Sequence, residues 1–133
     1  MIHVSLWQQY LAALVPFVLI DLLWLGVIAK GFYRHELGDL MREPIGKGAA
    51  LAFYLLYPLG LLVFVFPQAG TGSVAQAFIY GALLGLLTYG TYDLTNLATM
   101  RGFSTKLALV DWASGTLLTG TVAAIATAIL GRF

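Results

Sequence analysis

Long uninterrupted apolar runs dominate the chain, and four of them are long enough to cross a bilayer. A transmembrane helix needs about 20 predominantly apolar residues. The four runs cover about residues 7–29, 48–66, 74–100 and 107–130. A membrane β-barrel would instead show segments of about ten residues in which apolar and polar positions alternate. The pattern therefore predicts an all-α integral membrane protein, a four-transmembrane-helix bundle that forms a single membrane domain over residues 1–133.

One connection between these runs, Lys30–Lys47, is long enough to hold structure of its own. Within it, Phe32 and Leu37 fall near one helical face and Arg34 near the opposite face. This amphipathic pattern predicts a short interfacial helix that lies on the membrane and is ended by Pro44. The alternative is a solvated loop.

Composition supports a lipid environment and excludes several classes of function. Hydrophobic residues make up 60% of the chain and charged residues 10%, whereas a soluble domain carries roughly 25% charged residues. The chain has no cysteine, which excludes disulfides and thiolate chemistry. Its formal net charge of +1 gives no reason to expect nucleic acid as a partner. Membrane lipids are the expected surroundings.

The distribution of lysine and arginine predicts the orientation in the membrane. Six basic residues fall in two connections, and the opposite side holds only Arg132. Cytoplasmic connections carry the excess of basic residues. Both termini are therefore predicted to be periplasmic, in one dominant orientation. The six residues are Lys30, Arg34, Arg42, Lys47, Arg101 and Lys106.

Three acidic residues, Asp21, Asp93 and Asp111, fall inside predicted spans. Along an ideal helix they lie roughly 8–13 Å from the nearest basic residue at the cytoplasmic end. They therefore share a depth on three different helices. Carboxylates in hydrocarbon are costly and face the bundle interior. Held together there, at least one is expected to be protonated near neutral pH.

Other polar and aromatic groups occur near the same depth, whereas the outer half offers threonines such as Thr119 but no acid. The pattern predicts a cytoplasm-facing pocket with Asp93, Asp111 and Asp21 as candidate catalytic groups. The alternative is that each acid only joins helices through hydrogen bonds. The candidate ligand-binding residues are Asn96, Tyr92, Tyr89, Trp24, Tyr57, Tyr54, Trp112 and Ser114.

Small residues on the third and fourth spans predict close helix contact. Gly81 and Gly85 form a G-x-x-x-G pattern, which permits helices to approach closely. Packing within the bundle is favoured over a dimer face, and a homo-oligomer is left open. Asp93 and Asn96 have a spacing that suits Mg²⁺, but a single pair of this kind is weak evidence. No metal and no cofactor is expected.

The chain resembles a family of small bacterial inner-membrane proteins. The resemblance is carried by Tyr92-Asp-Leu-Thr-Asn-Leu-Ala-Thr-Met-Arg-Gly102 and by Val110-Asp-Trp-Ala-Ser-Gly115. Asp21-Leu-Leu-Trp24 and Phe53-Tyr-Leu-Leu-Tyr-Pro58 fit it too. The family is known as domain of unknown function two-one-seven-seven. The resemblance implies a four-helix protein of the bacterial inner membrane and no assigned chemistry. Ser114 stands where the family pattern leads us to expect a bulky aromatic residue.

Three classes of function remain open from the sequence. The first is a protein that binds or processes a lipid or apolar small molecule with its intramembrane carboxylates. The second is a proton- or cation-coupled transporter or channel, for which the ligand would be cationic and the protein oligomeric. The third is a structural or assembly protein. A transporter needs polar access from both faces, and the apolar outer halves of the spans favour a one-sided pocket.

Overall fold

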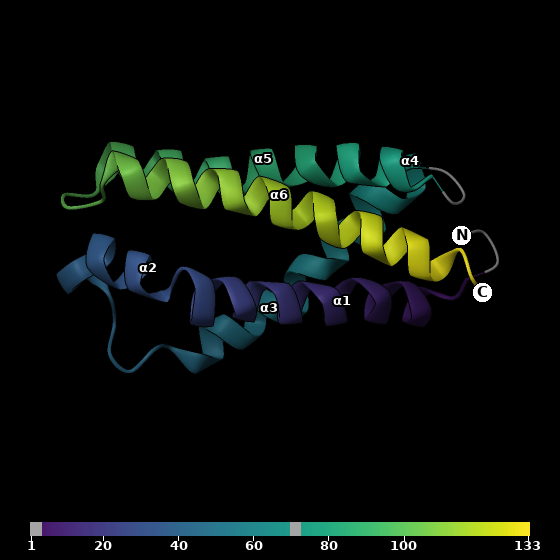
Figure 1. Cartoon of the computed structure of the whole chain (residues 1–133), viewed down its shortest axis with the longest axis horizontal. Helices are drawn as coiled ribbons and strands as arrows, with labels where there is room; N and C mark the ends of the chain where they lie inside the picture. Colours follow the sequence, from purple (N-terminus) through teal and green to yellow (C-terminus); the bar gives the residue numbers. More distant parts are fainter. Residues whose placement is uncertain (1–3, 70–72) are drawn as a thin grey trace.

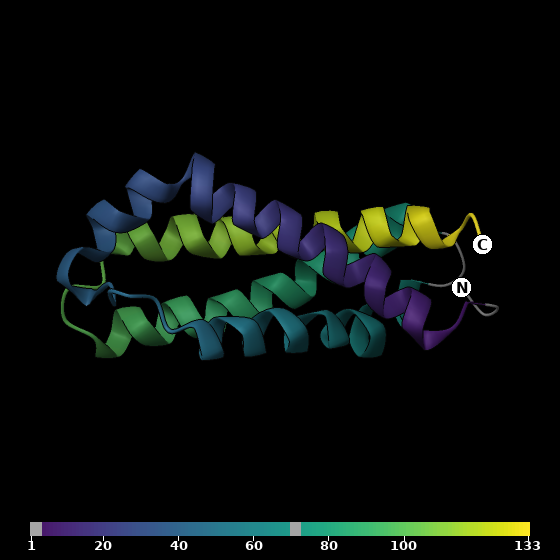
Figure 2. The ribbon, with the colours of Figure 1, turned by 90° about the horizontal axis from the view of Figure 1, so that it is seen from below.

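The computed structural model describes residues 4–69 and 73–133, and every regular element in these ranges is helical. Figures 1 and 2 show a long bundle in which the start of the first described helix and the C-terminus lie at one end, and the two basic connections lie at the other. Within the described residues, four helices are long and apolar enough to span a membrane. They are Leu6–Ile28, Lys47–Ala69, Val74–Thr99 and Thr105–Leu130. The predicted four-helix membrane bundle is confirmed.

Two of the spans are composite. The first joins α1 (Leu6–Leu23) to a π-helical turn, η1 (Trp24–Ile28). The second joins α3 (Lys47–Gly60), a π-helical turn η3 (Leu61–Val65) and α4 (Phe66–Ala69), so it continues three residues beyond the predicted end. The other two spans are the single helices α5 (Val74–Thr99) and α6 (Thr105–Leu130).

Serine residues form the N-caps of three of the spans. Ser5 forms a capping box with Gln8 at the start of α1. Ser73 caps α5, and Ser104 accepts a hydrogen bond of 2.9 Å from the backbone of Leu107 at the start of α6. Each cap satisfies a backbone N–H that has no partner inside its helix. These bonds fix where each helix enters the bundle.

The closest helix contact in the bundle joins α5 to α6 through glycines. A Cβ added to Gly85 would lie 2.6 Å from the carbonyl oxygen of Gly115, and one added to Gly81 would lie 2.6 Å from the Cβ of Ala123. Both helices therefore meet backbone to backbone. The small residues of the G-x-x-x-G pattern pack within the bundle, as predicted.

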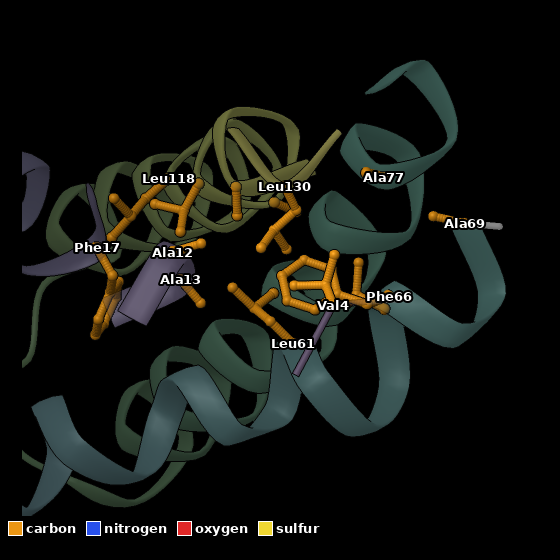
Figure 3. Close-up of a cluster of buried hydrophobic side chains, with 14 residues drawn as sticks. Val4, Ala12, Ala13, Phe17, Leu61, Phe66, Ala69, Ala77, Leu118 and Leu130 are labelled. Carbon is orange, nitrogen blue, oxygen red and sulfur yellow. The ribbon is translucent and has the colours of Figure 1, made fainter. Parts of the chain in front are cut away.

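A cluster of buried apolar residues fills the half of the bundle nearest the termini (Figure 3). Phe17 of α1, Leu61 and Val65 of η3 and Val122 of α6 are almost completely buried in it. By contrast, large apolar side chains such as Leu56 of α3 point outward and are exposed. A protein with a closed interior and an apolar exterior is suited to lipid as its solvent.

The connection predicted to hold an interfacial helix contains α2 (Lys30–Leu37) and a 3₁₀ turn, η2 (Gly38–Leu40). The connection thus contains a helix, as predicted, and its position on the membrane surface stays a prediction. The helix ends before Pro44, because Gly38 adopts a φ of 51° and turns the chain. Its apolar face does not lie free: Phe32 and Leu37 pack against the start of α6, around Phe103 and Leu107. The amphipathic pattern therefore serves docking onto the bundle.

Candidate functional site

A cavity of about 440 Å³ lies in the connection half of the bundle, beyond the apolar cluster. All four spans contribute to its wall. On each span, the lining residues lie nearer to the connection end than the buried cluster residues of that span, except that Leu118 belongs to both sets. The lining residues are Asp21, Trp24, Leu25, Phe53, Tyr57, Thr88, Tyr89, Tyr92, Asp111, Ser114, Gly115 and Leu118.

Asp21 brings a carboxyl group from α1 to this cavity. Its side chain is 5% exposed. The Tyr54 hydroxyl of α3 donates a hydrogen bond of 2.7 Å to Oδ2. Oδ1 has no hydrogen-bond partner among residues 4–69 and 73–133. One oxygen is therefore held in place, and the other is available to a ligand.

Asp111 brings a second carboxyl from α6 and is held by a residue of the connection. The Tyr33 hydroxyl of α2 donates a hydrogen bond of 2.7 Å to its Oδ1. The indole N–H of Trp24 donates to the same hydroxyl at 3.2 Å. Burial and the neighbouring Asp111 raise the pKa of Tyr33, so its phenol stays protonated and donates at physiological pH. These hydrogen bonds link η1, α2 and α6.

Asp93 of α5 lies directly behind the cavity wall. Its side chain is fully buried, and neither carboxyl oxygen has a hydrogen-bond partner in the described part of the chain. It is close enough to Asp111 for the two carboxyls to interact electrostatically. Asp21 and Asp111, which both line the cavity, interact in the same way. The structure thus brings together the three acids that the sequence places at one depth.

Aromatic side chains form most of the remaining wall. The Tyr57 and Tyr89 rings meet edge to face with centroids 5.9 Å apart, and Phe53 lies 5.4 Å from Tyr57. The Tyr57 hydroxyl is bonded to Thr88 at 3.0 Å and to Thr119 at 2.8 Å. Thr119, which the sequence places in the outer half, thus forms a hydrogen bond with Tyr57, a residue that lines the pocket.

The structure places the sequence-predicted site residues in three groups. Seven of the eleven line the cavity, while Asp93 and Tyr54 stand one layer behind it. Asn96 and Trp112 do not line this cavity. Asn96 lines another cavity at the connection end, and Tyr92, one turn before it on α5, lines both cavities. The seven are Asp21, Trp24, Tyr57, Tyr89, Tyr92, Asp111 and Ser114.

Trp112 points away from the cavity and toward α5. Its indole N–H donates a hydrogen bond of 2.9 Å to the backbone carbonyl of Leu86. Gly90 leaves the room that the ring needs, since a Cβ at Gly90 would lie 2.8 Å from the indole nitrogen. Trp112 therefore joins α6 to α5 and does not contact a ligand in this pocket.

Several residues of the pocket were not predicted from the sequence. Phe53, Thr88 and Leu118 line the wall, and Tyr33 holds Asp111. The apolar ones look like any lipid-facing residue in a hydrophobic run. Tyr33 lies in the connection, and only the docking of α2 against the bundle brings it near Asp111. The one available signal was its place on the predicted amphipathic helix.

A second cavity of about 420 Å³ adjoins the first between α1 and α6. Trp24, Ser114 and Leu118 belong to both walls, so the cavities meet at these three side chains. The rest of the second wall is almost entirely apolar. It consists of Ile20, Val110, Ala113, Leu117 and Thr121.

The described residues contain no group of three or more histidine, aspartate or glutamate side chains arranged to hold a metal ion.

Comparison with known proteins gives one result. The sequence model of a family described as "Predicted membrane protein (DUF2177)" matches residues 6–128. No curated protein and no solved structure matches the chain.

Proposed function

The chain belongs to the DUF2177 family of predicted membrane proteins, and from this premise we propose that it binds or processes a lipid or apolar small molecule in its intramembrane pocket. The proposal includes a bacterial inner membrane as its location, with the pocket near the cytoplasmic face. The observation that carries it is the cavity of about 440 Å³, in which two carboxyl groups and the hydroxyl residues Thr88 and Ser114 interrupt a mainly aromatic and apolar wall. Ligand sites combine an apolar lining with a few positioned polar groups in this way.

The packing of the opposite half supports a pocket over a transport path. Phe17, Leu61, Val65 and Val122 are almost completely buried in the cluster that closes the terminal half. The acids all lie on the connection side of that cluster. A ligand that reaches Asp111 therefore meets close-packed apolar side chains before the far face. A transporter would need this cluster to open, and binding does not.

The acids differ in a way that suits proton transfer to a ligand. Asp111 lines the cavity and can contact a ligand, whereas Asp93 does not line it and lies close enough to Asp111 to interact electrostatically. A general acid or base needs its reacting oxygen within hydrogen-bond reach of the substrate. In a reaction at this site, Asp111 is the catalytic residue, and Asp93 is a positioning residue that acts through it.

The orientation is tested by fusing reporters to the two ends of the bundle. Because both basic connections lie at one end (Figure 1), we expect alkaline phosphatase fused after Phe133 to be active and its insertion near Gly38 to be inactive. A fluorescent protein at the same points should give the opposite pattern. A cytoplasmic C-terminus would place the pocket near the periplasmic face and overturn this part of the proposal.

Pocket occupancy is tested by filling the cavity. Ser114 belongs to the walls of both cavities, so Ser114→Phe puts a ring into the space where they meet. We expect native mass spectrometry of the wild-type protein, purified with membrane lipids retained, to show a bound molecule. The Ser114→Phe variant should lose at least about nine-tenths of this occupancy, a change of roughly 1.4 kcal/mol.

The matched control is Leu109→Phe on the same helix. Leu109 is exposed and lines neither cavity, so its replacement adds the same ring outside the pocket. This variant should retain the bound molecule. Equal occupancy in both variants, with both folded by circular dichroism, would show that the molecule binds elsewhere.

A further inference from the structure

We propose that the ligand of this pocket is an amphiphilic organic cation, an ammonium group attached to an apolar chain. The inference rests on the proposed function, because it names the class of molecule that the pocket takes. The ammonium group lies in the first cavity between Asp21 and Asp111. The chain lies in the second cavity, between α1 and α6.

The charge of the first cavity favours a cation. Two carboxyl groups face it, and no lysine, arginine or histidine stands in its wall among the described residues. Asp21 is almost completely buried, and its Oδ1 lacks a partner in the described structure. Two acids that share a low-dielectric space repel each other when ionised. A bound cation between them replaces that repulsion with attraction.

The aromatic residues of the same wall favour an organic cation over a hydrated metal ion. Trp24, Tyr57, Tyr89 and Tyr92 line the same cavity as the two acids. Aromatic faces attract ammonium groups, and cages of several rings are the usual site for quaternary ammonium ligands. A metal ion would need several oxygen ligands at short range, and the described residues offer no group of acids arranged for one.

The second cavity accounts for the apolar part of the ligand. It opens from the first at Trp24, Ser114 and Leu118, and its remaining wall is almost entirely apolar. Val110 and Leu117 of α6 and Ile20 of α1 all line it. A chain that leaves the first cavity here stays in apolar surroundings and gains the free energy of burial.

The walls also argue against a phospholipid as the source of the ammonium group. A phosphate group is bound by arginine, lysine or backbone N–H donors. Neither cavity wall contains a basic side chain in the described structure. An ammonium group next to a phosphate would bring a negative charge toward Asp21 and Asp111. The ligand is therefore a single-charged amine or quaternary ammonium without a phosphate.

The proposal is tested with four probes and the intact protein in dodecyl maltoside micelles. Binding is measured by native mass spectrometry for dodecyltrimethylammonium, dodecyldimethylamine oxide, dodecylphosphocholine and tetramethylammonium. We expect dodecyltrimethylammonium to bind at least about tenfold more tightly than each of the others. The amine oxide lacks the net charge, the phosphocholine adds a phosphate, and tetramethylammonium lacks the chain.

Variants then test whether the two carboxyl groups cause the preference for the cationic probe. Asp111→Asn and Asp21→Asn each keep the size of the side chain, so either serves if the other fails to fold. We expect each to reduce the preference for the cation over the amine oxide by about tenfold. Asp39→Asn makes the same replacement at an exposed acid outside the pocket and should retain the full preference.

The outcomes separate this inference from the proposed function. Equal binding of the amine oxide and the ammonium probe would overturn the cation and leave an apolar pocket intact. Equal or tighter binding of the phosphocholine would assign the site to a lipid headgroup. If none of the chain-bearing probes binds and Ser114→Phe retains the co-purified molecule, the pocket itself is not a ligand site.

Discussion

Replacing Gly85 with alanine should lower the free energy of unfolding by about 1–3 kcal/mol, the range for overpacking a closely packed interior. The added Cβ would lie 2.6 Å from the carbonyl oxygen of Gly115 and 2.9 Å from the Cα of Thr116. Both obstacles are backbone, so no side-chain rotation relieves them. The α5 and α6 helices must separate, and the other contacts along this pair weaken with them.

The measurement is unfolding by sodium dodecyl sulfate in mixed micelles, followed by circular dichroism. Gly48→Ala is the matched control, because a Cβ at Gly48 meets nothing within 4 Å. Since alanine is the better helix former, this control should be as stable as the wild type or slightly more stable. Equal stability of Gly85→Ala and the wild type would show that the helices are not in backbone contact at this point.

Replacing Asp93 with asparagine should raise the free energy of unfolding by about 1–3 kcal/mol, the cost of a buried polar group left without a partner. Both oxygens of Asp93 are buried and unpaired within the described residues, next to Asp111. Asparagine has nearly the same volume and brings N–H donors that Asp111 can accept. The same change should reduce pocket occupancy, because it draws the Asp111 carboxyl away from the ligand.

Asp21→Asn is the comparison for this stability effect. One oxygen of Asp21 already accepts a hydrogen bond from Tyr54, and the other is not among the fully buried unpaired atoms of the described residues. Replacing Asp21 therefore relieves no fully buried unpaired atom and should not stabilise the protein. The same unfolding titration compares the two variants, and native mass spectrometry follows the bound molecule. A loss of more than about 1 kcal/mol in Asp93→Asn, on the scale of membrane hydrogen bonds, would falsify the assignment of Asp93 as an unsatisfied group kept for function.

The spans and the depth of the acids could be predicted because each depends only on position along the sequence. A continuous apolar run has few structural outcomes in lipid, and the rise per residue converts position into depth. The direction in which a side chain points around its helix is a different matter. Asp111 and Trp112 are adjacent in sequence, yet one faces the cavity and the other faces α5. Trp112 faces α5 because Gly90 of that helix leaves room for its ring and Leu86 accepts its hydrogen bond.

The residues that the sequence did not reveal depend on contacts between distant segments. Tyr33 reaches Asp111 only because α2 docks against the start of α6, where Glu36 accepts a hydrogen bond of 2.7 Å from Ser104. The second cavity likewise arises from the distance between α1 and α6. Neither feature leaves a periodic pattern in the sequence.

The hydrogen bond between Asp21 and Tyr54 also bears on the order in which the protein is made. It joins the first two spans, α1 and α3, and involves no later residue. Since synthesis proceeds from the N-terminus, these two spans enter the bilayer before the α5 and α6 pair that closes the bundle exists. A carboxyl group in lipid needs a hydrogen-bond donor during that interval. Tyr54 provides one as soon as the second span is inserted, so the nascent chain can hold Asp21 in the membrane until its last helices arrive.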